Sequence, residues 1–201
     1  MNFVDKAYSV FEQSIKDYHV LDSVDAQCDN PYPSQSIESL FYLKNHIDSV
    51  QWHLEDIIRR PDIKPAEALS VKRRIDQLNQ NRTDLVETID GYIVEAYKDV
   101  VPAKDATINT ETPAWALDRL SILALKIYHW TKETERTDCA TGHVSECRLK
   151  LNILIEQRKD LSASISQLLD DISSGRKIMK TYRQMKMYND PNLNPELYGR
   201  R

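Results

Sequence analysis

The chain has 201 residues, 41% of them hydrophobic and 29% charged, a composition typical of one compact domain rather than of a disordered or fibrous protein. The net charge is −4 with both signs spread along the chain, which points to neither a nucleic acid nor a membrane surface as partner. No stretch approaches the ~18 apolar residues that a membrane span needs. No secretory signal is visible and the 3 cysteines are sparse, so we expect a cytoplasmic protein.

Long helices dominate the predicted structure, because the chain has only 4 glycines and 8 prolines and the prolines fall near segment boundaries. In chain order we expect a helix at 3–21, a polar loop at 22–35, and helices at 37–60, 65–97 and 113–135. A fifth long helix is expected to begin between 138 and 145 and to end near 174. Ser36 and Thr112 are the predicted N-caps.

Apolar residues spaced three and four apart define the face that each helix is expected to bury. For the helix at 37–60 these residues are Leu40, Leu43, Ile47, Val50, Leu54 and Ile57. For the helix at 65–97 they are Ala68, Val71, Ile75, Leu78, Arg82, Leu85, Ile89, Tyr92 and Ala96. The face of the fifth helix contains one charged residue too, Arg158.

Four long amphipathic helices joined by short connections predict an all-α fold, an up-down antiparallel four-helix bundle formed by residues 36–175. We expect the additional N-terminal helix, in residues 1–21, to pack on the outside of this bundle or to cap one end. Residues 176–201 are expected to form a basic C-terminal helix or tail. The whole chain, 1–201, is predicted to be a single helical-bundle domain.

The third and fifth helices are similar in sequence. The stretch 82–85 (RTDL) recurs 76 positions later as 158–161 (RKDL), and Trp52-His53 meets Tyr128-His129 at the same offset. The apolar faces of the two preceding helices align better at an offset of 73. One interpretation is a duplication that produced two similar hairpins; the other is that heptad patterns produce such matches by chance.

Two arginines at core-facing positions, Arg82 and Arg158, are the leading candidates for a binding site, because a buried guanidinium needs acidic partners. The candidate residues around them are Asp48, Glu55, Asp118 and His53. A polar pocket in which both arginines bind a phosphate or carboxylate is one interpretation. A buried salt-bridge network that sets the register of the helices is the other.

Two further groupings are weaker candidates. Trp52, His53, Glu55 and Asp56, taken with Glu87 and Asp90, resemble faintly the Mg²⁺-binding carboxylates of all-helical nucleotide pyrophosphohydrolases. The periodicity, however, turns Glu87 and Asp90 outward, onto a solvated face. Cys139, His143 and Cys147 are spaced by four, but the glycine at 142 interrupts the helix that would align them. We therefore predict no metal, no cofactor and no catalytic residue.

The segment from 176 to 188 is basic and amphipathic. Its basic residues are Arg176, Lys177, Lys180, Arg183 and Lys186, without one acid, and they alternate with Met179, Tyr182, Met185 and Tyr188. One interpretation is docking on an acidic partner, RNA or a membrane surface. The other is a terminal helix whose Met and Tyr side chains pack on the bundle.

The loop before the helix at 113–135 is more elaborate than a helix start requires. Thr112 and Pro113 account for the cap, and this leaves Asn109, Glu111 and Trp115. These three residues are candidates for the rim of a pocket at one end of the bundle; the alternative is that they anchor the loop.

Four stretches of the chain are distinctive: 48–56 (DSVQWHLED), 72–76 (KRRID), 107–116 (TINTETPAWA) and 185–191 (MKMYNDP). Together they resemble a bacterial family known only as a domain of unknown function, number 4254. The resemblance implies a cytoplasmic protein of about this length, associated with genes for glycosyltransferases of cell-surface polysaccharide assembly. It implies no activity, cofactor or catalytic residue. His46 stands where the family is expected to have a second tryptophan.

Two functions remain open. The first is a non-catalytic helical-bundle protein, a binding or accessory partner in cell-surface polysaccharide synthesis that acts through protein contacts, with a glycosyltransferase or a second copy of the chain as candidate partner. The second is a small enzyme or sensor that binds a nucleotide or nucleotide sugar between Arg82 and Arg158. Because no catalytic grouping stands out, we favour the first, and we expect no nucleic-acid partner.

Overall fold

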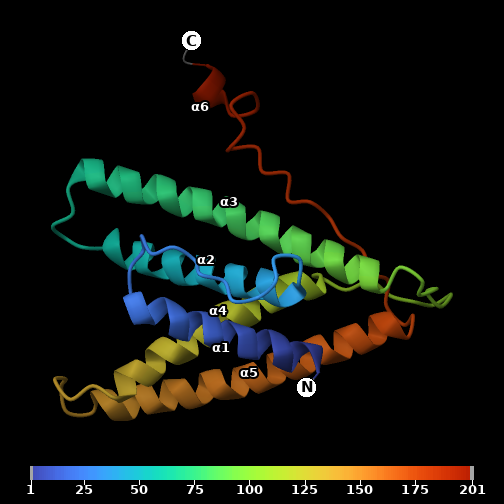
Figure 1. Cartoon of the computed structure of the whole chain (residues 1–201), viewed down its shortest axis with the longest axis horizontal. Coiled ribbons are helices and arrows are strands. Elements are labelled where there is room, and N and C mark those ends of the chain that lie inside the picture. Colours follow the sequence, from blue (N-terminus) through green and yellow to red (C-terminus); the bar gives the residue numbers. More distant parts are fainter. Residues whose placement is uncertain (1, 200–201) are drawn as a thin grey trace.

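The computed structural model describes residues 2–199 and shows a protein built of helices (Figure 1). The helices are α1 (Phe3–Leu21), α2 (Ile37–Ile57), α3 (Pro65–Ala96), α4 (Pro113–Thr134), α5 (His143–Ser173) and the short α6 (Pro195–Tyr198). The all-α class is confirmed, since residues 2–199 form no strand and contain only an isolated bridge between Thr107 and Lys177. In the same part of the chain, none of the helices has the length and apolar character needed to cross a bilayer.

The helices begin where their capping residues predict. The side chain of Ser36 accepts a hydrogen bond from the backbone N–H of Ser39, and the side chain of Thr112 accepts one from Trp115. α5 begins at His143, inside the predicted window. α2 ends three residues earlier than expected, because the chain already turns ahead of the proline at 61.

The central helix of the bundle is α4, which packs against α1, α2, α3 and α5. α2 and α4 form the inner pair, and α3 and α5 lie on opposite flanks (Figure 1). Each inner helix is followed by a longer flanking helix: α2 and α3 have 21 and 32 residues, α4 and α5 have 22 and 31. These matched lengths agree with two similar hairpins, and the duplication itself stays a prediction.

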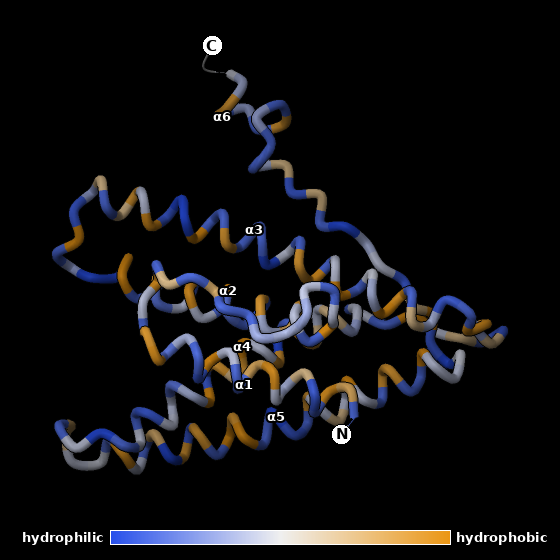
Figure 2. The backbone as a smooth tube through the Cα atoms, viewed as in Figure 1, coloured by the Kyte–Doolittle hydropathy of each residue, from blue (hydrophilic) through white to orange (hydrophobic). Residues whose placement is uncertain are grey.

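The N-terminal helix α1 is an integral part of the core, more than the outer helix that the sequence predicted. It packs along α2 and α4 and touches α5. Its buried residues are Val4, Ala7, Tyr8, Val10, Phe11, Ser14, Ile15 and Tyr18. The rings of Phe11 and of Phe41 on α2 meet edge to face with their centroids 5.7 Å apart. Figure 2 shows hydrophobic and hydrophilic residues alternating along α3 and α5, as expected of flanking helices that bury one face.

The buried faces of α2 and α3 differ in part from the predicted faces. Leu43 and Tyr92, expected inside, are 36% and 44% exposed. Asp90, expected on a solvated face, is buried and accepts a hydrogen bond from the backbone N–H of Ala114 at 3.2 Å. The first N–H groups of α4 have no partner inside their own helix, so a carboxylate from α3 satisfies one of them.

The basic segment after α5 is the predicted tail and not a helix. Residues 176–194 have no helical structure and lead to α6, which stands apart from the other helices (Figure 1). Residues 184–189 of this segment contact α3. The backbone N–H of Gln184 donates to Glu87 at 3.0 Å, and Nζ of Lys186 donates to Thr83 at 2.6 Å. This segment is therefore held on α3 by hydrogen bonds of an extended chain, and not by the packing of a terminal helix.

We expect Phe41→Ala to lower the free energy of unfolding by about 3–5 kcal/mol, because Phe41 is fully buried between helices and its truncation leaves a cavity. Leu43→Ala, two positions away on the same helix, is expected to cost less than about 1 kcal/mol. Urea unfolding followed by circular dichroism measures both values. Equal losses, or a larger loss for Leu43→Ala, would contradict the orientation of α2.

Candidate functional site

Four charged side chains meet inside the bundle. They are Lys44 and Asp48 of α2, Arg82 of α3 and Asp118 of α4. Nζ of Lys44, which is 1% exposed, contacts Asp48 and lies 2.8 Å from Oδ1 of Asp118. Nε of Arg82 lies 3.0 Å from the same oxygen of Asp118. Two positive and two negative groups make this ion-pair network neutral overall, the condition under which a protein tolerates buried charge.

Neutral side chains complete the ion-pair network. Oγ of Ser121 donates a hydrogen bond to Asp48 at 2.7 Å, and Nδ2 of Asn45 donates to Oγ of Ser121 at 3.0 Å. Burial raises the pKa of Asp48 against the opposing effect of Lys44. Because its members come from three helices, the network determines how α2, α3 and α4 align.

A pocket of about 300 Å³ opens beside Arg82, between α2, α3 and α4. Its lining includes Asp48, Gln51, Trp52, Glu55, Arg59 and Arg82. The structure therefore brings Arg82, Asp48 and Glu55 together, with Asp118 paired to Arg82. Both arginines of this pocket are already engaged by acids, Arg82 by Asp118 and Arg59 by Glu55.

Arg158 lies elsewhere in the molecule. Its guanidinium sits over the ring of Tyr8 on α1, 3.8 Å from the ring centroid. Arg158 does not line the pocket that opens beside Arg82, so the two arginines do not share it. The anion site predicted between the two arginines is thus not formed, and each arginine contacts a different helix.

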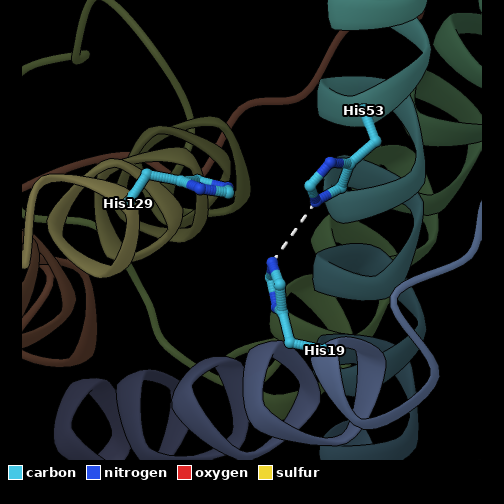
Figure 3. A group of neighbouring side chains, drawn as sticks. All are labelled: His19, His53 and His129. Atoms are coloured by element: carbon cyan, nitrogen blue, oxygen red, sulfur yellow. Dashed lines mark hydrogen bonds between the residues drawn. The ribbon is translucent and has the colours of Figure 1, made fainter. Parts of the chain in front are cut away.

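His53 belongs to a cluster of three histidines that the sequence pattern did not predict. His19 of α1, His53 of α2 and His129 of α4 point toward one another (Figure 3), and one ring atom of each lies within 4.8 Å of the others. Burial lowers the pKa of His53, and it lowers the pKa of His129 to about 4, so both are neutral at neutral pH. One feature of the sequence pointed to two members of this cluster: Trp52-His53 recurs as Tyr128-His129.

A second group with metal-binding side chains joins α4 to α5. Nε2 of His143 lies 2.9 Å from Glu133 and 3.4 Å from Sγ of Cys147. His143 and Cys147 are therefore together, as their spacing suggested. Cys139 is not part of the group, and its thiol lies near the carbonyl oxygen of Arg136 instead.

Asn109 and Glu111 of the loop and Trp115 at the start of α4 line a cavity of about 410 Å³ at one end of the bundle, called the end cavity below. The opposite wall is the chain after α5, residues 178–184, and side chains of α5 form the floor. The same loop residues have anchoring contacts: Nδ2 of Asn109 donates to the carbonyl oxygen of Glu111 at 3.2 Å. The two interpretations of this loop therefore apply together.

Backbone pairing holds the two walls of the end cavity side by side. The N–H of Thr107 donates to the carbonyl oxygen of Arg176 at 3.1 Å, and the N–H of Ile178 donates to that of Thr107 at 2.9 Å. Gly175 directs the chain into this pairing with a φ of 73°. A Cβ at this position would lie 2.7 Å from the carbonyl oxygen of Val101, so only glycine fits here.

The fold and these sites define an all-α helical-bundle protein with a neutral ion-pair network at its centre and a cavity at one end. Residues 38–181 match the family described as "Protein of unknown function (DUF4254)", and the chain belongs to that family. The matched range runs from the second residue of α2 to beyond the end of α5 and includes the loop of the end cavity. No match was found among curated proteins or among solved structures.

We expect Lys44→Met to destabilise the protein by about 3–5 kcal/mol, because it leaves Asp48 and Asp118 buried with one cation fewer. The matched control is Lys72→Met, which removes an i,i+4 partner of Asp76 on the surface of α3. That pair is about half exposed, so its loss should cost less than about 0.5 kcal/mol. Urea unfolding of both variants measures the two losses of unfolding free energy. Similar losses would contradict a network in which Lys44 neutralises buried carboxylates.

Proposed function

We propose that the protein is a non-catalytic binding protein, accessory to cell-surface polysaccharide synthesis, and that it binds a nucleotide or nucleotide sugar in the end cavity. The observation that carries this proposal is the combination of two aromatic rings and two cations around one cavity. The rings belong to Trp115 and Tyr182, and the cations to Lys180 and Arg183.

The aromatic rings suit a nucleobase. Tyr182 is 71% exposed, so its ring has a face available to a ligand, and Trp115 is half-buried at the start of α4. Stacking of a base on an aromatic side chain contributes about 1–3 kcal/mol and accepts any base. The cavity therefore offers a place for a flat ring between the loop and the chain after α5.

The cations suit phosphate groups. Within residues 2–199 neither Lys180 nor Arg183 forms an ion pair with an acid. Nζ of Lys180 lies over the ring of Tyr182, 5.4 Å from its centroid. The acid on the rim, Glu111, is held by Arg119 at 2.7 Å. A pyrophosphate entering the cavity thus meets two cations without having to displace a carboxylate.

The pocket beside Arg82 is the second candidate for the same ligand, and its charges favour it less. Its two arginines are paired with Asp118 and Glu55, so an anion would have to compete with both. Asp48, which also lines the pocket, adds negative charge. An anionic ligand is therefore better accommodated in the end cavity than between α2, α3 and α4.

The probes for this function are UDP and UDP-glucose, titrated into the full chain by isothermal calorimetry. We expect binding of both compounds. Lys180→Gln combined with Arg183→Gln should weaken it roughly 10- to 100-fold, since a hydrogen bond to a charged group contributes about 1.5–3 kcal/mol. Tyr182→Ala should weaken it by a similar factor through lost stacking.

Control variants separate the two pockets. Arg73→Gln and Tyr188→Ala remove an exposed cation and an exposed ring outside the end cavity, and both should bind as the wild type does. Loss of binding in Arg82→Gln with unchanged binding in the Lys180/Arg183 variant would move the ligand to the pocket beside Arg82. No binding of either nucleotide compound would refute the proposed ligand.

The accessory role rests on the resemblance to proteins encoded with glycosyltransferases, whose donor substrates are nucleotide sugars. We propose a cytoplasmic glycosyltransferase as the protein partner. An acidic surface of this glycosyltransferase would dock on the basic segment around Lys186. Met185 and Tyr188 beside this lysine are 83% and 58% exposed, and the five basic residues of 176–188 have no acid among them.

Co-expression with a glycosyltransferase of cell-surface polysaccharide assembly tests the proposed partner. The two proteins should co-purify, and Met185→Ser with Tyr188→Ser should reduce the recovered partner several-fold, because the contact loses its apolar area. Leu149→Ser with Ile153→Ser, on the exposed side of α5, is the control. A reduction by the α5 variant alone would relocate the contact, and no co-purification would exclude this partner.

A further inference from the structure

Three helices that are far apart in the sequence bring one imidazole each to the same point. His19 lies in the last turn of α1, His53 lies on α2 and His129 on α4, and Figure 3 shows the three rings facing one another. A potential ligand atom of each ring lies within 4.8 Å of those of the other two. In proteins, three histidine side chains are one of the usual ligand sets for a zinc ion whose fourth coordination position stays open.

Hydrogen bonding at His19 leaves its Nε2 free to act as a ligand. Nδ1 of His19 lies 2.7 Å from the carbonyl oxygen of Ile15. A carbonyl oxygen only accepts, so Nδ1 carries the hydrogen and Nε2 carries the lone pair. A metal-binding histidine is usually held in this way, with its other ring nitrogen donating to a carbonyl or carboxylate.

The nearest pair of rings already has the spacing of two zinc ligands. Nε2 of His53 and Nε2 of His19 are 3.3 Å apart. Two nitrogens bound at ~2.0–2.1 Å to one tetrahedral zinc ion are also about 3.3 Å apart. Nε2 of His129 is buried and has no hydrogen-bond partner within residues 2–199. A metal ion would satisfy this nitrogen and replace the contact between the other two rings.

Aromatic neighbours hold the rings in place. The indole of Trp52 stacks on His129 with centroids 4.7 Å apart and an interplanar angle of 6°. The ring of Tyr18 stacks on His53 at 5.2 Å and 16°. Rings fixed by packing lose little freedom when they bind, which favours affinity.

From this geometry we propose that His19, His53 and His129 bind one divalent transition-metal ion of the zinc type. The fourth position is open to water or to Asp22, whose Oδ1 lies 3.8 Å from Nε2 of His53. Asp22 ends α1 in a left-handed conformation with a φ of 47°, and its side chain is 61% exposed, so an ion reaches the site from solvent. This site is separate from the end cavity and does not depend on the nucleotide proposal.

Zinc titration of the metal-stripped full chain, followed by calorimetry and by elemental analysis after desalting, tests the site. We expect one zinc ion per chain. His53→Gln and His129→Gln should each weaken zinc binding by about a hundredfold or more, above the ~10–100-fold typical of losing a residue that only supports a ligand. His46→Gln is the matched control, because His46 lies on α2 beside Tyr18 but outside the cluster, and it should retain full affinity.

Cobalt substitution of the wild type identifies the ligands without relying on any variant. Co²⁺ bound by imidazoles gives visible absorption bands and no thiolate charge-transfer band. A thiolate band, or zinc binding lost in Cys147→Ser and kept in His53→Gln, would place the metal at Glu133, His143 and Cys147 and overturn the proposal. A chain that retains no zinc at one equivalent would overturn it as well.

Discussion

Lys44 is buried between two carboxylates, and the arrangement of the inner helices depends on this contact. A single unpaired charge in this position would cost several kcal/mol, so α2 and α4 must align Lys44 with both Asp48 and Asp118. Arg82 then adds α3 to the same network. His129 follows Asp118 by about three turns of α4 and therefore lies on the same side of that helix. The alignment set by the ion pairs is thus also the alignment that carries an imidazole of α4 toward α1 and α2.

The centre of the bundle and its end differ in how far their polar groups are satisfied. At the centre every charged group has a partner of opposite sign, and the surrounding helices are packed on several sides. At the end, Lys180 and Arg183 border a cavity whose walls are a loop and an extended chain. In many proteins a rigid scaffold of helices or strands provides the stability, and the loops that it positions carry the binding residues. In this protein the end cavity is walled by irregular backbone, whereas the ion pairs lie between regular helices.

The parts of the structure that local sequence signals control were predictable. Ser36 and Thr112 cap helices where expected, and a charged residue in an apolar face correctly marked Arg82 as needing an acid. Arg158 was paired with the wrong neighbour, because periodicity shows which face is buried but not which helix covers it. Lys44 and Asp90 were missed since an inner helix, or the start of a neighbouring helix, supplies partners that no local pattern reveals. The end cavity needs residues from two segments that only the fold brings together, although its loop residues were singled out.

The position of α1 has a consequence for the order in which the chain folds. α1 packs against α2, and also against α4 and α5, which begin about ninety or more residues downstream. During synthesis its apolar face, including Phe11 and Ile15, is therefore complete long before its partners on the second hairpin exist. Contacts of such sequence separation slow folding and leave hydrophobic surface uncovered in the meantime. The first hairpin can shelter only part of α1, so the native core closes only after both α4 and α5 have been made.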